Sequence, residues 1–192
     1  MSSVDLENLN KLDYPPLTQD LDEAKEHLDL YGLALIENAL SDEEVKEMDD
    51  RLNEQFLGEE KFKVGSKLRG DEGFGVESSE EQKVSRLVWN LINKGDCFLK
   101  LIDHPKILPL IQHIIGERVC LCSMGAHMNG SGNERMALHQ DQWPLVPHPM
   151  NFPFMANVMY LISDNSPENG GTRLIPGSHK WPVIDYRTAN SE

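Results

Sequence analysis

Two residues of this chain, His139 and Asp141, have the types and the spacing of a metal-binding pair. In a β-strand, the side chains at positions i and i+2 point to the same face, so an imidazole and a carboxylate there can converge on one ion. Gln140 between them would point to the opposite face. Two histidines and one carboxylate bind Fe(II) in non-haem oxygenases and leave coordination positions open for substrate and O₂. The sequence therefore predicts a metal site that needs a third ligand from elsewhere.

A glycine-containing turn and a second loop follow this pair about thirty residues downstream, after an apolar run over 158–162. The three motifs are His139-Gln140-Asp141, Asn169-Gly170-Gly171 and Pro176-Gly177-Ser178-His179. In their order and spacing they resemble the phytanoyl-CoA dioxygenase family of Fe(II)/2-oxoglutarate oxygenases. The resemblance extends from about Leu33 to the end of the chain.

This resemblance implies an α+β or mainly β fold. Its core would be a double-stranded β-helix, which is a jelly-roll-like and cupin-like arrangement of strands, with the N-terminal helices packed outside. His139 and Asp141 would be the catalytic residues and the ligands of Fe(II). Gln140 would contribute near the 2-oxoglutarate cosubstrate, whereas the strand geometry sends its side chain the other way. The implied reaction uses O₂ to hydroxylate a small organic or acyl substrate.

The sequence departs from the family pattern in its C-terminal part. The family has a distal histidine after the P-G-S-H loop, and then an arginine that would hold 2-oxoglutarate by a bidentate ion pair. This chain ends at Glu192 without a match for either residue, since Arg173 and Arg187 do not occupy the arginine position. We therefore expect residues 1–192 to be a single dioxygenase domain that is incomplete at its C-terminus and lacks the last strands.

Two other interpretations of the same residues stay open. The chain could be a naturally shortened, catalytically inactive relative that acts as a binding or interaction module. It could also be a cupin-like isomerase or hydrolase with another divalent metal at His139 and Asp141, although the P-G-S-H loop speaks against this.

The composition is that of an ordinary globular domain, with 192 residues, 39% hydrophobic and 26% charged. A net charge of −14 opposes binding to nucleic acid and to anionic membranes. The chain has neither a leader pattern at Met1 nor a run of about eighteen apolar residues, so we expect a cytoplasmic protein. Without a leader, its three cysteines argue against a disulfide framework, and Cys120 and Cys122 are expected as small core or strand residues.

The elements that must position the site fall into two parts: a mostly helical part over 1–116 and the strands of the β core over 117–192. The apolar spacing and the capping residues predict helices over 19–31, capped by Thr18 and stopped by Gly32, and over 42–58, with a capping box of Ser41 and Glu44. Further helices are expected over 79–95 and 105–116. Strands are expected over 33–36, from Val119 toward His127, and over 152–162. Residues 59–75 are expected to form an irregular loop, either a plain connector or a lid.

Overall fold

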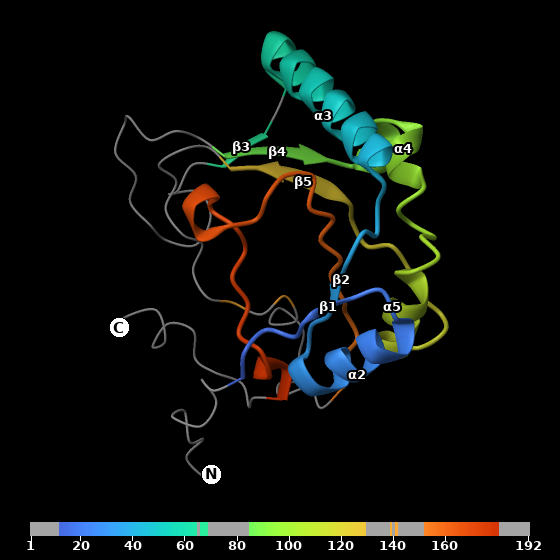
Figure 1. Ribbon diagram of the computed structural model, residues 1–192. Helices are drawn as coiled ribbons and strands as arrows, with labels where there is room; N and C mark the ends of the chain where they lie inside the picture. The colour runs from blue at the N-terminus through green and yellow to red at the C-terminus, as the bar shows by residue number, and fades with distance from the viewer. Residues whose placement is uncertain are drawn as a thin grey trace.

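A three-stranded antiparallel sheet under a long helix forms one end of the molecule, and two shorter helices form the other (Figure 1). The computed structural model describes residues 12–64, 66–68, 85–129, 139, 141 and 152–180. Its elements are β1 Leu17–Thr18, α2 Leu21–Tyr31, β2 Leu35–Ile36, α3 Asp42–Phe62, β3 Ser66–Leu68, β4 Ser85–Trp89, η1 Leu91–Asn93, α4 Asp96–Leu99, α5 Leu108–Ile115, β5 Gly125–Met128, η2 Pro167–Asn169 and η3 Ser178–Lys180. The predicted α+β class is confirmed.

Strand β4 is the centre of the three-stranded sheet, with β3 on one side and β5 on the other. Leu87 pairs with Ser66 of β3 and with His127 of β5, both in antiparallel register. Leu87 and the next residue, Val88, are both buried, as expected for a central strand covered on two faces. The prediction of a helix over 79–95 is therefore wrong for residues 85–95, the part that the structure describes. Backbone pairing on two sides outweighs a local apolar spacing that is also compatible with a helix.

Helix α3 begins at the predicted capping box. The amide of Glu44 donates to Ser41 Oγ at 3.2 Å, and the amide of Ser41 donates to Glu44 Oε2 at 2.8 Å. The helix does not stop at Gly58 as predicted but continues to Phe62. A glycine inside a helix costs only about 1 kcal/mol relative to alanine, which a 21-residue helix with a packed face can absorb.

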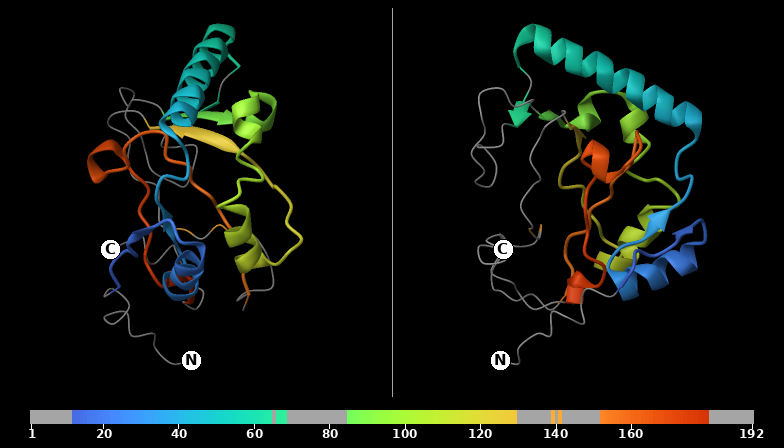
Figure 2. Two further views of the ribbon diagram at one scale, coloured as in Figure 1. Left: turned by 45° about the vertical axis from the view of Figure 1, so that its right-hand side comes forward. Right: turned by 60° about the vertical axis from the view of Figure 1, so that its left-hand side comes forward.

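The main hydrophobic core lies between α3, α4 and the sheet, as the two views of Figure 2 show. Its buried members are Met48, Phe56, Val88, Leu91, Cys97, Phe98 and Leu101. Tyr160 and Ile162 of the C-terminal part pack against this cluster and are partly buried. The core therefore connects the helical part of the chain to the segment that follows Asp141.

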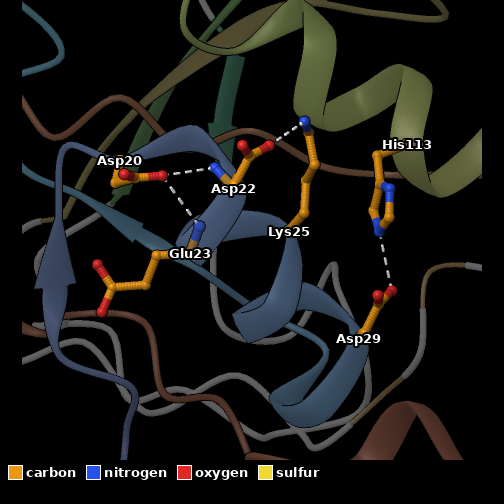
Figure 3. Close-up of polar contacts among 6 residues, drawn as sticks. All are labelled: Asp20, Asp22, Glu23, Lys25, Asp29 and His113. Carbon is orange, nitrogen blue, oxygen red and sulfur yellow. Dashed lines mark hydrogen bonds and ion pairs between the residues drawn. The ribbon is translucent and has the colours of Figure 1, made fainter.

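Helix α2 closes the opposite end, next to the parallel pair β1–β2. Its N-cap is Asp20 and not the predicted Thr18, because Asp20 Oδ1 accepts from the amides of Asp22 at 2.8 Å and Glu23 at 3.2 Å (Figure 3). Thr18 instead donates to the Glu23 carboxylate at 2.5 Å. The predicted stop at Gly32 is confirmed, with a left-handed φ of 74°.

Helix α5 packs along α2, and the two helices are joined by a hydrogen bond between His113 Nε2 and Asp29 Oδ1 at 2.9 Å (Figure 3). The helix starts at Leu108, three residues later than the predicted Pro105, because residues 105–107 form a turn. Its end at Gly116 is as predicted. No helix in the described ranges has the length and the apolar content of a membrane span.

The C-terminal part has fewer regular elements than the sequence predicts. Strand β5 begins only at Gly125, so Cys120 and Cys122 lie exposed before it and are neither core nor strand residues. Residues 153–161 are not a strand either, because none of the described residues pairs its backbone with them. Consequently Phe152, Met159 and Leu161 are exposed, whereas a core strand would have buried them.

The double-stranded β-helix that the family resemblance implies stays a prediction. Within the described ranges the strands form one three-stranded sheet and one two-residue parallel pair. A double-stranded β-helix needs two facing sheets. Of the expected loop over 59–75, residues 59–62 belong to α3 and 66–68 to β3, and residues 65 and 69–75 lie outside the described residues.

Candidate metal centre

His139 and Asp141 lie close together, but not on the strand that the sequence analysis assumes, because Asp141 is in a turn and His139 has no regular structure. The distance between His139 Nε2 and Asp141 Oδ1 is 3.4 Å, and the two side chains are 33% and 52% exposed. Two ligands with bonds of about 2.1 Å that meet a metal ion at a right angle lie about 3.0 Å apart. The pair therefore fits one divalent ion with only a small adjustment. Gln140, the middle residue of the motif, lies outside the described residues.

Asn157 adds a contact that the sequence analysis missed. Its Nδ2 donates a hydrogen bond to Asp141 Oδ2 at 2.5 Å, across sixteen positions of the chain. The two oxygens of Asp141 thus have different neighbours: Oδ1 faces His139 and Oδ2 faces Asn157. An asparagine inside the otherwise apolar run 152–162 was the one available indication of this role.

The described ranges do not supply a third ligand. They contain no group of three or more His, Cys, Asp or Glu side chains that could hold a metal ion. His127 lies in β5 opposite Leu87 of β4. His104 is held in another contact, with its Nε2 2.9 Å from the carbonyl oxygen of Ala39. His139 and Asp141 are therefore a pair of candidate ligands, without a third among the described residues.

The P-G-S-H loop packs on the C-terminal end of α2. The amide of Gly177 donates to the carbonyl oxygen of Tyr31 at 2.6 Å, and His179 Nε2 lies 3.4 Å from the carbonyl oxygen of Asp29. A Cβ atom at Gly32 would lie 2.2 Å from His179 Nδ1, so only glycine leaves room for this ring. Burial lowers the pKa of His179, which favours the neutral imidazole. This loop connects the two parts of the chain.

Tyr160 anchors the segment that carries Asn157. Its hydroxyl donates to the carbonyl oxygen of Leu101 at 3.1 Å, and its ring lies 6.0 Å from that of His104. Burial raises the pKa of Tyr160 to about 12, so the phenol keeps its proton and the hydrogen bond persists at neutral pH. Asn157 is thus only three residues from a fixed point on the core.

The described residues form an α+β protein in which the two outer residues of an H-x-D motif, His139 and Asp141, lie 3.4 Å apart. The family model "Phytanoyl-CoA dioxygenase (PhyH)" matches residues 28–191, which include the pair, the turn and the P-G-S-H loop. The chain belongs to the phytanoyl-CoA dioxygenase family. Members of this family typically use Fe(II) and 2-oxoglutarate, together with O₂ and a small substrate.

Curated relatives cover most of this chain. Dioxygenase af480 of Aspergillus fumigatus is 28% identical over 165 residues, which are 86% of this chain and 51% of the relative. The probable alpha-ketoglutarate-dependent hypophosphite dioxygenase of Stutzerimonas stutzeri is 29% identical over 170 residues, 88% of this chain and 57% of the relative. Dioxygenase sphC of Aspergillus fumigatus is 24% identical over 172 residues, which are 84% of this chain and 46% of the relative. The chain thus spans about half the length of these relatives, and no solved structure matches it significantly.

Proposed function

We propose that this chain contributes the first two metal ligands of an Fe(II)/2-oxoglutarate-dependent dioxygenase that hydroxylates a small organic or acyl substrate. The observation that carries the proposal is the approach of His139 Nε2 to Asp141 Oδ1 at 3.4 Å. Membership of the family supports it, and so do the names of the relatives. The complete fold would be the double-stranded β-helix of the family, with residues 1–192 inside one domain.

The two ligands have complementary tasks. His139 offers a nitrogen lone pair, and Asp141 offers a carboxylate whose negative charge partly offsets that of a divalent cation. When bound, Fe(II) with 2-oxoglutarate supplies the O₂ chemistry that inserts oxygen into an unactivated C–H bond and yields succinate and CO₂. The protein's own part is to orient the ligands and to exclude water.

Other parts of the proposed site must come from residues that the structure does not describe. Gln140 would contribute near the 2-oxoglutarate site, as the motif implies. A third ligand and a basic side chain for the distal carboxylate of 2-oxoglutarate are also needed.

The experiment that tests this function measures succinate formed from 2-oxoglutarate by the full chain with Fe(II) and O₂. We expect His139→Ala to reduce succinate formation by at least a hundredfold, because one of two close ligands is lost. His113→Ala is the matched control, since that histidine contacts Asp29 of α2 and neither His139 nor Asp141, and it should keep full activity. Equal succinate formation by wild type and His139→Ala would contradict the proposal. A folded wild type that forms no succinate is expected both for an incomplete site and for an inactive binding module, so the comparison of variants requires a protein that turns over.

A further inference from the structure

The hydrogen bond from Asn157 to Asp141 gives the metal pair a feature that the motif alone does not contain. We infer that Asn157 is a positioning residue that holds the Asp141 carboxylate with Oδ1 toward His139, so that Asp141 binds metal through one oxygen. This inference rests on the proposed role of His139 and Asp141 as ligands. It concerns how the carboxylate is oriented and how many coordination positions it occupies.

The two Asp141 oxygens are distinguished by their distances to neighbours. Oδ2 lies 2.5 Å from Asn157 Nδ2, and Oδ1 lies 3.4 Å from His139 Nε2. The Asp141 side chain is 52% exposed, so without this hydrogen bond the carboxylate could rotate or present both oxygens to an ion. A hydrogen bond to a charged oxygen is short and strong, and partners of this kind orient metal ligands in many sites.

Asn157 can act as a fixed donor because its own segment is anchored to the core. Three residues further on, Tyr160 donates to the Leu101 carbonyl oxygen, and Ile162 packs against the buried cluster. On the other side of Asn157, the rings of Phe152 and Phe154 meet edge to face, 6.5 Å apart. The backbone is therefore anchored to the core three residues after Asn157, and from there the exposed Asn157 side chain reaches Asp141.

A neutral amide suits this task better than a charged donor. A lysine or arginine at position 157 would form an ion pair with Asp141 and compete with the cation for its charge. The Asn157 amide constrains Oδ2 and leaves the full negative charge of the carboxylate for the metal. Binding through one oxygen also keeps a coordination position free, which a site that must accept 2-oxoglutarate and O₂ requires.

The test is a titration of the full chain with Mn(II) in the absence of 2-oxoglutarate, followed by electron paramagnetic resonance of the free ion. Asn157→Leu keeps the size of the side chain and removes the donor, whereas Asn157→Gln keeps the amide. We expect Asn157→Leu to weaken Mn(II) binding 10- to 100-fold and Asn157→Gln to recover part of that loss. The matched control is Asn93→Leu, an exposed asparagine at the end of η1, which should bind Mn(II) like wild type.

A second readout separates positioning from a general effect on folding. The Tm of the metal-free protein should be the same for wild type and Asn157→Leu. The visible absorption of the Co(II)-loaded protein should change in Asn157→Leu, since band intensity depends on coordination number and a freed carboxylate can bind through two oxygens. An unchanged Co(II) spectrum with a lowered metal-free Tm would assign Asn157 a structural role and overturn the inference.

The variants also distinguish failure of this inference from failure of the proposed function. Wild-type Mn(II) affinity in Asn157→Leu, together with loss of binding in His139→Ala, would overturn the positioning role and leave the metal pair intact. Unchanged affinity in both variants would mean that His139 does not bind the metal, and the proposed function would fall with the inference.

Discussion

The two regions of this molecule, residues 12–129 and residues 139–180, are stabilised in different ways. The first contains four helices and both groups of paired strands among its described residues, with a capping box at Ser41 and a buried cluster around Met48. Across residues 139, 141 and 152–180, the structure shows two 3₁₀ turns and otherwise irregular backbone. Yet the second region carries both candidate metal ligands. The candidate metal pair thus lies in the region whose described residues have the least regular secondary structure.

The second region is held to the first by a few long-range contacts. The Tyr14 hydroxyl donates to the Leu174 carbonyl oxygen at 2.8 Å and accepts from the Leu174 amide at 3.0 Å. Asn129 Nδ2 donates to the Gly170 carbonyl oxygen at 2.9 Å, and Gly177 is bonded to the end of α2. The difference teaches that the geometry of the site depends on contacts with the helical region more than on its own segment. Each prediction below therefore changes one region or one contact between them.

The largest effect on stability should come from the core of the first region. Met48 is 1% exposed, so Met48→Ala should lower the free energy of unfolding by about 2–5 kcal/mol, as truncation of a buried side chain does. Leu57→Ala is the matched control on the same helix, because Leu57 is 65% exposed, and its effect should be well below 1 kcal/mol. Denaturant unfolding measures both values. Similar losses for the two variants would show that α3 does not pack as described.

A smaller effect should follow from breaking the contact between the regions at Gly32. Gly32→Ala combines a left-handed φ of 74° with a Cβ that overlaps the His179 ring, so it should cost about 1–2 kcal/mol or more. Gly58→Ala inside α3 meets nothing within 4 Å and should instead stabilise the protein by about 0.5–1 kcal/mol. Thermal unfolding should therefore shift in opposite directions. A shift in the same direction would contradict the packing of the P-G-S-H loop on α2.

The smallest effect should come from the anchor of the Asn157 segment. Tyr160→Phe removes one partly buried hydrogen bond to Leu101 and should cost about 1 kcal/mol at neutral pH. Because Tyr160 ionises near pH 12 when folded and near pH 10 when unfolded, the unfolded chain loses this proton first. The advantage of wild type over Tyr160→Phe should thus decline as the pH rises from 10 to 12. An advantage that is constant over this range would contradict the burial of the phenol.

The comparison of regions also explains what the sequence could predict. The capping box of Ser41 and Glu44 and the stop at Gly32 depend on neighbours within a few positions, and both are confirmed. Strand β4 was predicted as a helix, because its strand character comes from β3 and β5, which lie far from it in sequence. The closeness of His139 and Asp141 follows from their neighbouring positions even without the expected strand, whereas the contact of Asn157 spans sixteen positions and has no local signal.

The central claim is that His139 and Asp141 bind Fe(II) for 2-oxoglutarate chemistry. Anaerobic addition of Fe(II) and 2-oxoglutarate to the full chain tests it most directly, because electron transfer from the metal to the bound 2-oxo acid gives a visible absorption band. The account predicts this band in wild type and its loss in Asp141→Ala. The control is Asp50→Ala, which removes an exposed partner of Lys46 on α3 and should retain the band. A wild-type protein without the band, or an Asp141→Ala variant that keeps it, would contradict the claim.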